Sequence, residues 1–323
     1  MAPARELIPK IKKAASTPAP LKSYRLSSRK SRYDSATRRH AHFRQPPALP
    51  AATKLRIDAM PSPFLSAYSR ARLRTLAMLL VTAPVFAFAD PAPMAVKNIV
   101  LVHGAFADAS SWAKIVPLLE AEGYHVVAVQ NPLTSLADDV AATKRIIALQ
   151  DGPVLLVGHS WGGAVITQVG DDPKVAGLVY VAAYAPDAGQ SANSASTPFG
   201  ITAGQKQIRV DSDKFAYMTS EGILEDFAQG LSIPERKLVL AVEGESYGPM
   251  FDEKLTVAAW KTKPTWVVVS LQDRMLPPAM EQDEGKRPNA IVTILPTCHL
   301  AMLEQPAKVA AVIDDAAKSA LRK

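Results

Sequence analysis

The sequence predicts an α/β fold in which helices cover both faces of a doubly wound, mainly parallel sheet of about six strands. From residue 98 onward, short apolar runs rich in β-branched residues alternate with longer segments of helical periodicity. The apolar runs are nearly continuous, which is typical of strands buried on both faces of a parallel sheet. One long interruption in this alternation predicts an inserted cap.

Six apolar runs are interpreted as strands. They are residues 98–104, 125–130, 154–159, 175–183, 265–273 and 290–296. The segment after the first run ends on Gly123, as a helix C-cap does. The segment after the second begins at Ser135 with Asp138 three residues on, which is a capping pattern. Both segments fit the crossover helices that parallel strands need.

Residues 184–264 separate the fourth predicted strand from the fifth and are far longer than a crossover requires. Helix-like pieces lie near 203–209, 221–230 and 234–240. We expect this segment to form a helical cap over the carboxyl edge of the sheet, where ligands bind in open α/β sheets. The alternative is a surface excursion that contacts no site.

Basic charge is concentrated near the start of the chain. Residues 1–75 hold 17 of the 37 Lys and Arg residues but only 3 of the 30 Asp and Glu residues. Because this stretch also lacks periodic apolar positions, residues 1–59 are expected to be a disordered basic leader. The folded domain is expected at 90–323, which is acidic overall, so nucleic-acid binding is not expected.

Residues 60–89 have the pattern of a secretory signal peptide. Arginines between 70 and 74 precede an apolar stretch too short for a membrane span, and a small-x-small cleavage site ends at Ala89. We therefore expect a periplasmic or secreted protein with no stable membrane span in the mature chain. The alternative is an uncleaved hydrophobic anchor. Because signal peptides begin a translated chain, we hypothesise that translation starts at Met60.

The stretch Gly-His-Ser-Trp-Gly at 158–162 is the first candidate for chemistry. It directly follows an apolar strand and opens a helical segment, as a nucleophile elbow does. Gly158 and Gly162 would leave room where strand and helix approach each other. The motif alone is a modest signal, and a plain glycine turn is the alternative, but its context favours Ser160 as a nucleophile.

A serine hydroxyl needs a general base, and histidine is the usual one near neutral pH. Among six histidines, His299 follows the last predicted strand, the place expected of the base in the chain order Ser, Asp or Glu, His. The other five lie in the leader, beside glycine motifs or at the start of a strand. His299 is therefore the predicted base.

A carboxylate should hold the imidazole in the correct tautomer. Asp273 follows the penultimate strand and precedes a Pro-Pro break. Asp187, after the fourth strand, is the competing candidate. We favour Asp273, because Asp187 begins the cap, where a solvated turn aspartate is the ordinary explanation.

Backbone amides should stabilise the oxyanion that nucleophilic attack creates. One is expected from Trp161, which follows the nucleophile, and the other from Ala105, in the glycine-containing loop after the first strand. Four residues are candidate substrate-pocket walls by position alone, namely Phe106, Trp161, Met275 and Leu276.

At these residues the sequence resembles the α/β-hydrolase superfamily, over essentially all of 97–320. The segments LVHGAFADASSW, GHSWGG and CHLAMLEQP are similar to those of small single-domain esterases related to plant methyl-ester hydrolases and hydroxynitrile lyases. The resemblance implies a triad of Ser160, Asp273 and His299. It also implies an oxyanion hole made by the two amides named above and no metal or organic cofactor.

Four positions depart from the relatives, and one of them is Trp161, where Tyr, Leu or Met commonly follows the serine. The lyases carry a lysine directly after the triad histidine and a threonine after the first-strand histidine, whereas this chain has Leu300 and Gly104, which disfavours lyase chemistry. Cys298 stands where a serine is common and is interpreted as a small buried hydrophobe rather than a reactive thiol. As the only cysteine, it can form no intramolecular disulfide.

The predicted function is hydrolysis of the carboxylic ester of a small molecule through an acyl-enzyme. Two alternatives stay open. Cofactor-free haloperoxidase or perhydrolase chemistry uses the same triad, and a catalytically silent binding protein can share the fold. The sequence does not indicate an oligomeric state.

Overall fold

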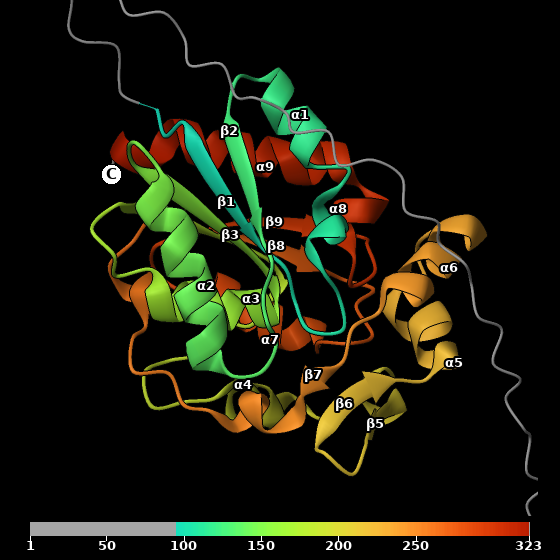
Figure 1. The fold of residues 1–323 in the computed structure, drawn as a ribbon. Helices are drawn as coiled ribbons and strands as arrows, with labels where there is room; N and C mark the ends of the chain where they lie inside the picture. Colours follow the sequence, from blue (N-terminus) through green and yellow to red (C-terminus); the bar gives the residue numbers. More distant parts are fainter. Residues whose placement is uncertain (1–94, 323) are drawn as a thin grey trace, which may run out of the picture. The chain divides into compact units, whose positions relative to one another are not determined.

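The computed structural model describes residues 95–322, and these contain the predicted parallel sheet (Figure 1). The strands are β1 (Asn98–Val102), β2 (His125–Val129), β3 (Val154–Ser160), β4 (Val175–Ala183), β8 (Thr265–Ser270) and β9 (Ala290–Leu295). They pair in parallel in the order β2-β1-β3-β4-β8-β9. The predicted fold class is confirmed.

Burial explains the apolar pattern of the strands. β1, β3 and β8 are buried along their whole length, and β4 is buried at all but one position. The edge strands β2 and β9 are partly exposed. A central strand of a parallel sheet touches helices on both faces, so apolar residues are favourable at successive positions.

Helices cover the sheet on both sides, with α2 and α3 in front and α9 behind in the view of Figure 1. The helices outside residues 184–264 are α1 (Val116–Ala121), α2 (Leu136–Leu149), α3 (Trp161–Val169), α7 (Pro278–Gly285), α8 (Ala301–Glu304) and α9 (Pro306–Ser319). The Ser135 hydroxyl accepts from the Asp138 amide at 3.0 Å and caps α2 as predicted. Gly123 follows α1 with φ of +83°, the left-handed conformation expected after a helix end.

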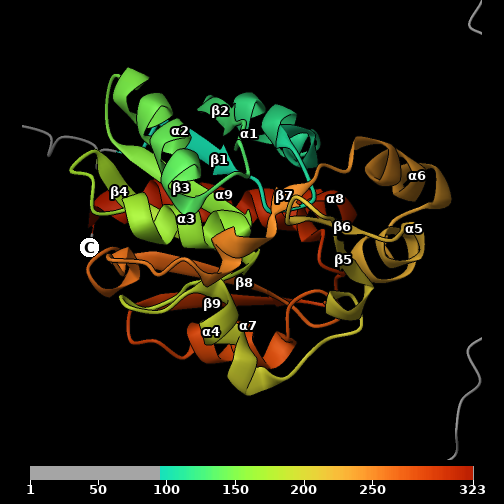
Figure 2. The same ribbon diagram turned by 60° about the horizontal axis from the view of Figure 1, so that its bottom comes forward.

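Residues 184–264 differ from the predicted helical cap, because they also contain a small antiparallel sheet (Figure 2). Its strands are β5 (Ile208–Val210), β6 (Phe215–Met218) and β7 (Ser246–Tyr247), and the α-helices are α4 (Ala192–Ser196), α5 (Ser220–Gly222) and α6 (Ile233–Val242). The helix expected at 234–240 is present as α6. The one expected at 221–230 is reduced to α5 and a single π-helical turn, Ile223–Phe227.

The helix expected at 203–209 does not form, so this prediction is wrong. A 3-10 turn, Gln205–Gln207, leads directly into β5, which pairs with β6. The turn between the two strands is fixed by Asp211, whose Oδ1 accepts from the amides of Asp213 and Phe215 at 2.9 and 2.8 Å. Aspartate side chains that bond backbone amides ahead of them favour turns over helix.

The predicted leader (1–59) and signal peptide (60–89) lie outside the described residues. Within residues 95–322, no helix combines the length and the apolar character that a membrane crossing requires.

Candidate active site

Ser160 lies at the junction of β3 and α3 in a conformation that few residues adopt. Its φ is +52°, in the left-handed region that costs free energy for a residue with a side chain. A Cβ on Gly162 would lie 2.3 Å from the Val102 carbonyl oxygen, and one on Gly158 would lie 2.6 Å from the Gly162 oxygen. The spacing role predicted for these glycines is confirmed, since any side chain there would push strand and helix apart.

His299 and Asp273 are hydrogen-bonded to each other. His299 Nδ1 and Asp273 Oδ2 are 2.6 Å apart, and both residues are buried. Asp273 Oδ1 accepts from the amides of Met275 and Leu276 at 2.6 and 2.9 Å. Because a carboxylate only accepts, His299 donates from Nδ1, which leaves Nε2 free to take a proton.

The competing carboxylate is engaged elsewhere. Asp187 forms an ion pair with Lys261 at 2.5 Å, and its side chain is 39% exposed. Hydrogen bonding and the charge of Lys261 hold the pKa of Asp187 below its usual value. Asp187 is therefore a surface residue of the insertion, as its position at the start of the cap suggested.

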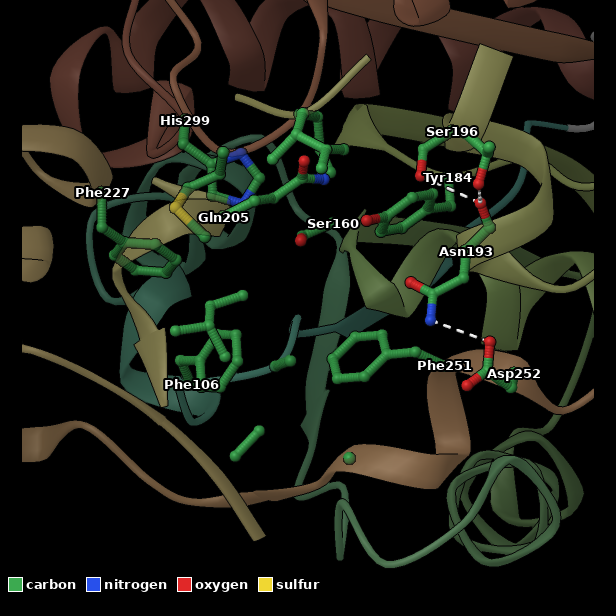
Figure 3. A pocket seen from close by; sticks show the side chains of 18 of the residues that line it. Phe106, Ser160, Tyr184, Asn193, Ser196, Gln205, Phe227, Phe251, Asp252 and His299 are labelled. Carbon is green, nitrogen blue, oxygen red and sulfur yellow. Dashed lines mark hydrogen bonds between the residues drawn. The ribbon is translucent and has the colours of Figure 1, made fainter. Parts of the chain in front are cut away.

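Ser160 and His299 line one cavity of about 700 Å³ (Figure 3). This volume lies within the range of sites for small organic ligands, roughly 300–1,000 Å³. Phe106 and Phe227 lie on one side of Ser160, and Asn193 lies on the other. Phe251 and Tyr184 lie on the side of Asn193, so both sides of the cavity carry aromatic rings.

The loop after β1 lies against Ser160. A Cβ on Gly104 would come within 2.6 Å of the Ser160 Cβ, and Ala105 lines the cavity. The Phe106 amide donates to the buried Ser246 hydroxyl at 3.1 Å. Trp161 is the first residue of α3, where amides have no partner within the helix. The amides of Ala105 and Trp161 therefore remain the predicted oxyanion donors.

The indole of Trp161 does not line the cavity, contrary to its expected place as a pocket wall. It is completely buried, and its Nε1 donates to Asp139 Oδ2 at 2.7 Å. Asp139 also accepts from the Leu133 amide at 2.8 Å. The indole finds its hydrogen-bond acceptor on α2, which holds it outside the cavity. Burial raises the pKa of Asp139 to about 6 despite these two bonds.

The other three expected pocket walls, Phe106, Met275 and Leu276, all line the cavity. The sequence reasoning missed the walls that come from residues 184–264, among them Phe227 and Asn193. No short motif marks them, because they reach the cavity only through the path of the insertion.

Two further histidines fix the backbone around the site. His159 Nε2 donates to the His299 carbonyl oxygen at 3.0 Å, and burial lowers the pKa of His159 well below its usual value, so its ring is neutral. His103 Nε2 accepts from the Asn131 amide at 3.0 Å, while its Nδ1 lies 2.8 Å from the Gly104 oxygen. Their places beside glycine motifs were visible in the sequence, but their structural roles were not.

A second buried carboxyl lies next to Asp273. Glu281 Oε2 accepts from the Ser270 amide at 2.8 Å, and the side chain is 1% exposed. Burial, reinforced by the negative charge of Asp273, raises the pKa of Glu281 well above its usual value. A neutral Glu281 leaves a single negative charge, that of Asp273, beside His299.

Cys298 is buried and its amide donates to Glu304 Oε2 at 2.7 Å. Burial is the main cause that raises the pKa of its thiol to about 12, so it stays protonated and unreactive near neutral pH. Within residues 95–322, no group of three or more His, Cys, Asp or Glu side chains is arranged to hold a metal ion.

Comparison with known proteins identifies the family. A model of the alpha/beta hydrolase family matches residues 99–312. The chain belongs to this family.

Individual relatives match over shorter stretches. A pyrethroid hydrolase of Sphingobium wenxiniae is 37% identical over 103 residues, which cover 28% of this chain and 37% of that protein. Methylesterase 1 of Arabidopsis thaliana is 32% identical over 126 residues, which cover 34% of this chain and 48% of that protein. The matched segments thus span less than half the length of these relatives.

Solved structures show the same fold over the whole domain. A pyrethroid hydrolase crystal structure superposes with a TM-score of 0.60 at 24% identity, covering 71% of this chain and all of that one. Polyneuridine aldehyde esterase superposes with a TM-score of 0.60 at 20% identity, covering 68% of this chain and 99% of that one.

Proposed function

We propose that this protein hydrolyses the carboxylic ester of a small molecule through an acyl-enzyme. One observation carries the proposal. His299, which is hydrogen-bonded to Asp273, lines the same cavity as Ser160, the residue at the elbow between β3 and α3. Membership of the alpha/beta hydrolase family supports it, as do relatives named methylesterase.

In the proposed first half-reaction, Ser160 Oγ attacks the ester carbonyl carbon and its proton passes to His299 Nε2. Asp273 holds the imidazole in place and stabilises its positive charge. The amides of Ala105 and Trp161 stabilise the negative charge on the carbonyl oxygen, at about 3 kcal/mol for each donor.

The tetrahedral intermediate then collapses. The bond between the carbonyl carbon and the alcohol oxygen breaks, and His299 gives its proton to that oxygen. Water repeats the sequence on the acyl-enzyme, which releases the carboxylic acid and restores Ser160. Every proton is carried by His299, so no cofactor is required by these steps.

The test is hydrolysis of p-nitrophenyl acetate by the intact chain and by Ser160→Ala. We expect kcat/KM to fall by roughly 10⁴-fold or more, as when a triad nucleophile is removed elsewhere. Ser212→Ala, in an exposed turn of the insertion, is the matched control and should stay within about twofold of the parent. Undiminished activity of a folded Ser160→Ala protein would refute the proposal.

We also infer that the protein is exported, from the signal-peptide pattern at residues 60–89. N-terminal sequencing of the protein purified from its native source should give a start close to residue 90. A chain that still begins at Met1 or Ala2 would contradict both the export and the expected start at Met60.

A further inference from the structure

A second, smaller cavity lies beneath α6. It encloses about 160 Å³ and is called the side chamber here. Its walls are mainly apolar and include Ala107, Leu231, Leu238, Val239, Leu300 and Leu303. This volume is close to that of a cavity, roughly 150 Å³, that accepts benzene in another protein.

The side chamber and the catalytic cavity share two residues, Phe106 and Phe227, which line both. Both phenyl rings are visible on the same side of Ser160 (Figure 3). The Phe227 ring lies 5.2 Å from the imidazole of His299, measured between ring centroids. Phe227 therefore separates the side chamber from the catalytic cavity at a point next to His299, the proposed proton donor.

We propose that the side chamber binds the apolar alcohol portion of the ester, and this rests on the proposed function of the catalytic cavity. The alcohol oxygen must face His299 to receive its proton when the bond to the carbonyl carbon breaks. The carbon chain of the alcohol starts at that oxygen. Phe227, which packs against His299, is the apolar surface that this chain meets, and the side chamber lies beyond it.

The outer wall of the chamber is suited to a variable occupant. It is formed by α6, which contributes no fully buried side chain and lies at the periphery in Figures 1 and 2. Leu238 lines the chamber yet is 64% exposed. An apolar group in the chamber would cover such surface, which is favourable.

The side of the catalytic cavity away from Phe227 is mixed in character, because Phe251 lies there beside polar groups (Figure 3). Asn193 and Asp252 line it there, and the Asn193 amide donates to Asp252 Oδ1 at 2.9 Å. Asn193 and Asp252 are available to the acyl side of the ester, while the apolar side chamber takes its alcohol side. The expected substrate class is therefore an ester of an aliphatic or aromatic alcohol with about six carbons.

The test compares acetate esters of straight-chain alcohols from methanol to octanol, followed by acid release. With the parent protein, kcat/KM should rise by about fourfold per methylene until the chamber is filled, near six carbons. Val239→Trp fills the chamber and should lower the hexyl-to-methyl ratio of kcat/KM by at least tenfold. Ala241→Trp, an exposed position of α6 outside the chamber, is the matched control and should keep the parent ratio.

Val239→Ala enlarges the chamber and guards against a misfolded tryptophan variant. It should shift the best substrate from hexyl toward octyl acetate. An unchanged ratio in folded Val239→Trp, together with an unchanged optimum in Val239→Ala, would overturn the proposal.

A parallel series of p-nitrophenyl esters with acyl chains of two to eight carbons separates the two sides of the ester. If substitutions at residue 239 change the preference among acyl chains but not among alcohols, the side chamber does not bind the alcohol portion, and the proposal is overturned. If the parent protein cleaves no ester in either series, the proposed function itself fails, and the proposed role of the side chamber fails with it.

Discussion

The parallel-sheet body and the insertion at 184–264 are built differently, and they contribute different things to the site. The body supplies Ser160 at the end of β3 and Asp273 in the loop after β8, and both of these strands are buried. It supplies His299 from the loop after the partly exposed edge strand β9. The insertion supplies pocket walls such as Phe227, and its longest helix, α6, has no fully buried side chain.

This difference shows where precision is needed. Proton transfer requires atoms placed within a few tenths of an ångström, which the ladder of a buried parallel sheet provides. Substrate selection needs only a cavity of suitable shape, which loosely packed segments can provide and vary. Substitutions in the body should therefore cost far more activity and stability than substitutions in the insertion.

The largest effect is expected in the body at Asp273. Asp273→Asn keeps the size of the side chain but removes its charge. Its remaining oxygen stays with the amides of Met275 and Leu276, so an NH2 donor faces His299 Nδ1 in place of the acceptor. We expect kcat/KM for p-nitrophenyl acetate to fall by about 10⁴-fold, as it does for other triads. Asp187→Asn, in the insertion, is the control and should stay within about twofold. Similar losses in the two variants would break the contrast.

Gly162 in the body and Gly244 in the insertion allow the tightness of packing in the two regions to be compared directly. Gly162→Ala would place a Cβ 2.3 Å from the Val102 oxygen, so the free energy of unfolding should fall by about 3 kcal/mol. At Gly244, in the insertion, the nearest atom to a new Cβ is 4.0 Å away. Gly244→Ala should therefore change stability by less than about 1 kcal/mol. Urea unfolding of both variants measures this, and equal losses would contradict it.

Asp139 gives the body a pH-dependent stability. Its pKa is raised by burial from 3.8 to about 6, so the folded protein binds the proton more tightly than the unfolded chain. Stability should therefore fall as pH rises from about 4 to about 6, by up to about 3 kcal/mol from this group. Asp139→Asn should show a shallower decline across that window in urea unfolding. Parallel curves for the two proteins would show that Asp139 titrates normally.

The smallest effect is expected at the ion pair between Lys114 and Glu235, which joins α6 to the body at 2.5 Å. Hydrogen bonding to Lys114 is the main cause that lowers the pKa of Glu235 to about 2. Both side chains are more than a third exposed, so solvent screens the pair. Glu235→Gln keeps a helix-capping side chain and should cost less than about 1 kcal/mol, with a smaller loss in 1 M salt. A larger, salt-independent loss would mean that α6 is anchored more firmly than its burial suggests.

The same contrast explains what the sequence could predict. All six parallel strands were expected within three residues of their observed ends. In the central strands, burial on both faces favours an unbroken apolar run, and the edge strands β2 and β9 keep apolar, β-branched residues although they are partly exposed. The elbow glycines were equally visible, since close approach of backbones allows no other residue.

Within the insertion, short elements depend on long-range contacts. β5 and β6 were missed because three or four residues carry too little periodicity, although the Asp-rich turn at 211–214 was a usable signal. The Trp161 indole was misplaced for a related reason. Its acceptor, Asp139, lies on another helix, and no local pattern in the sequence connects the two residues.

The proposed activity depends on Ser160 acting as a nucleophile activated by His299. The most direct measurement is covalent labelling with a fluorophosphonate, located by mass spectrometry of the digested protein. We expect one adduct per chain, on the peptide that carries Ser160, and none in Ser160→Ala. A parent protein that stays unlabelled while folded, or a label that persists in Ser160→Ala, would contradict it.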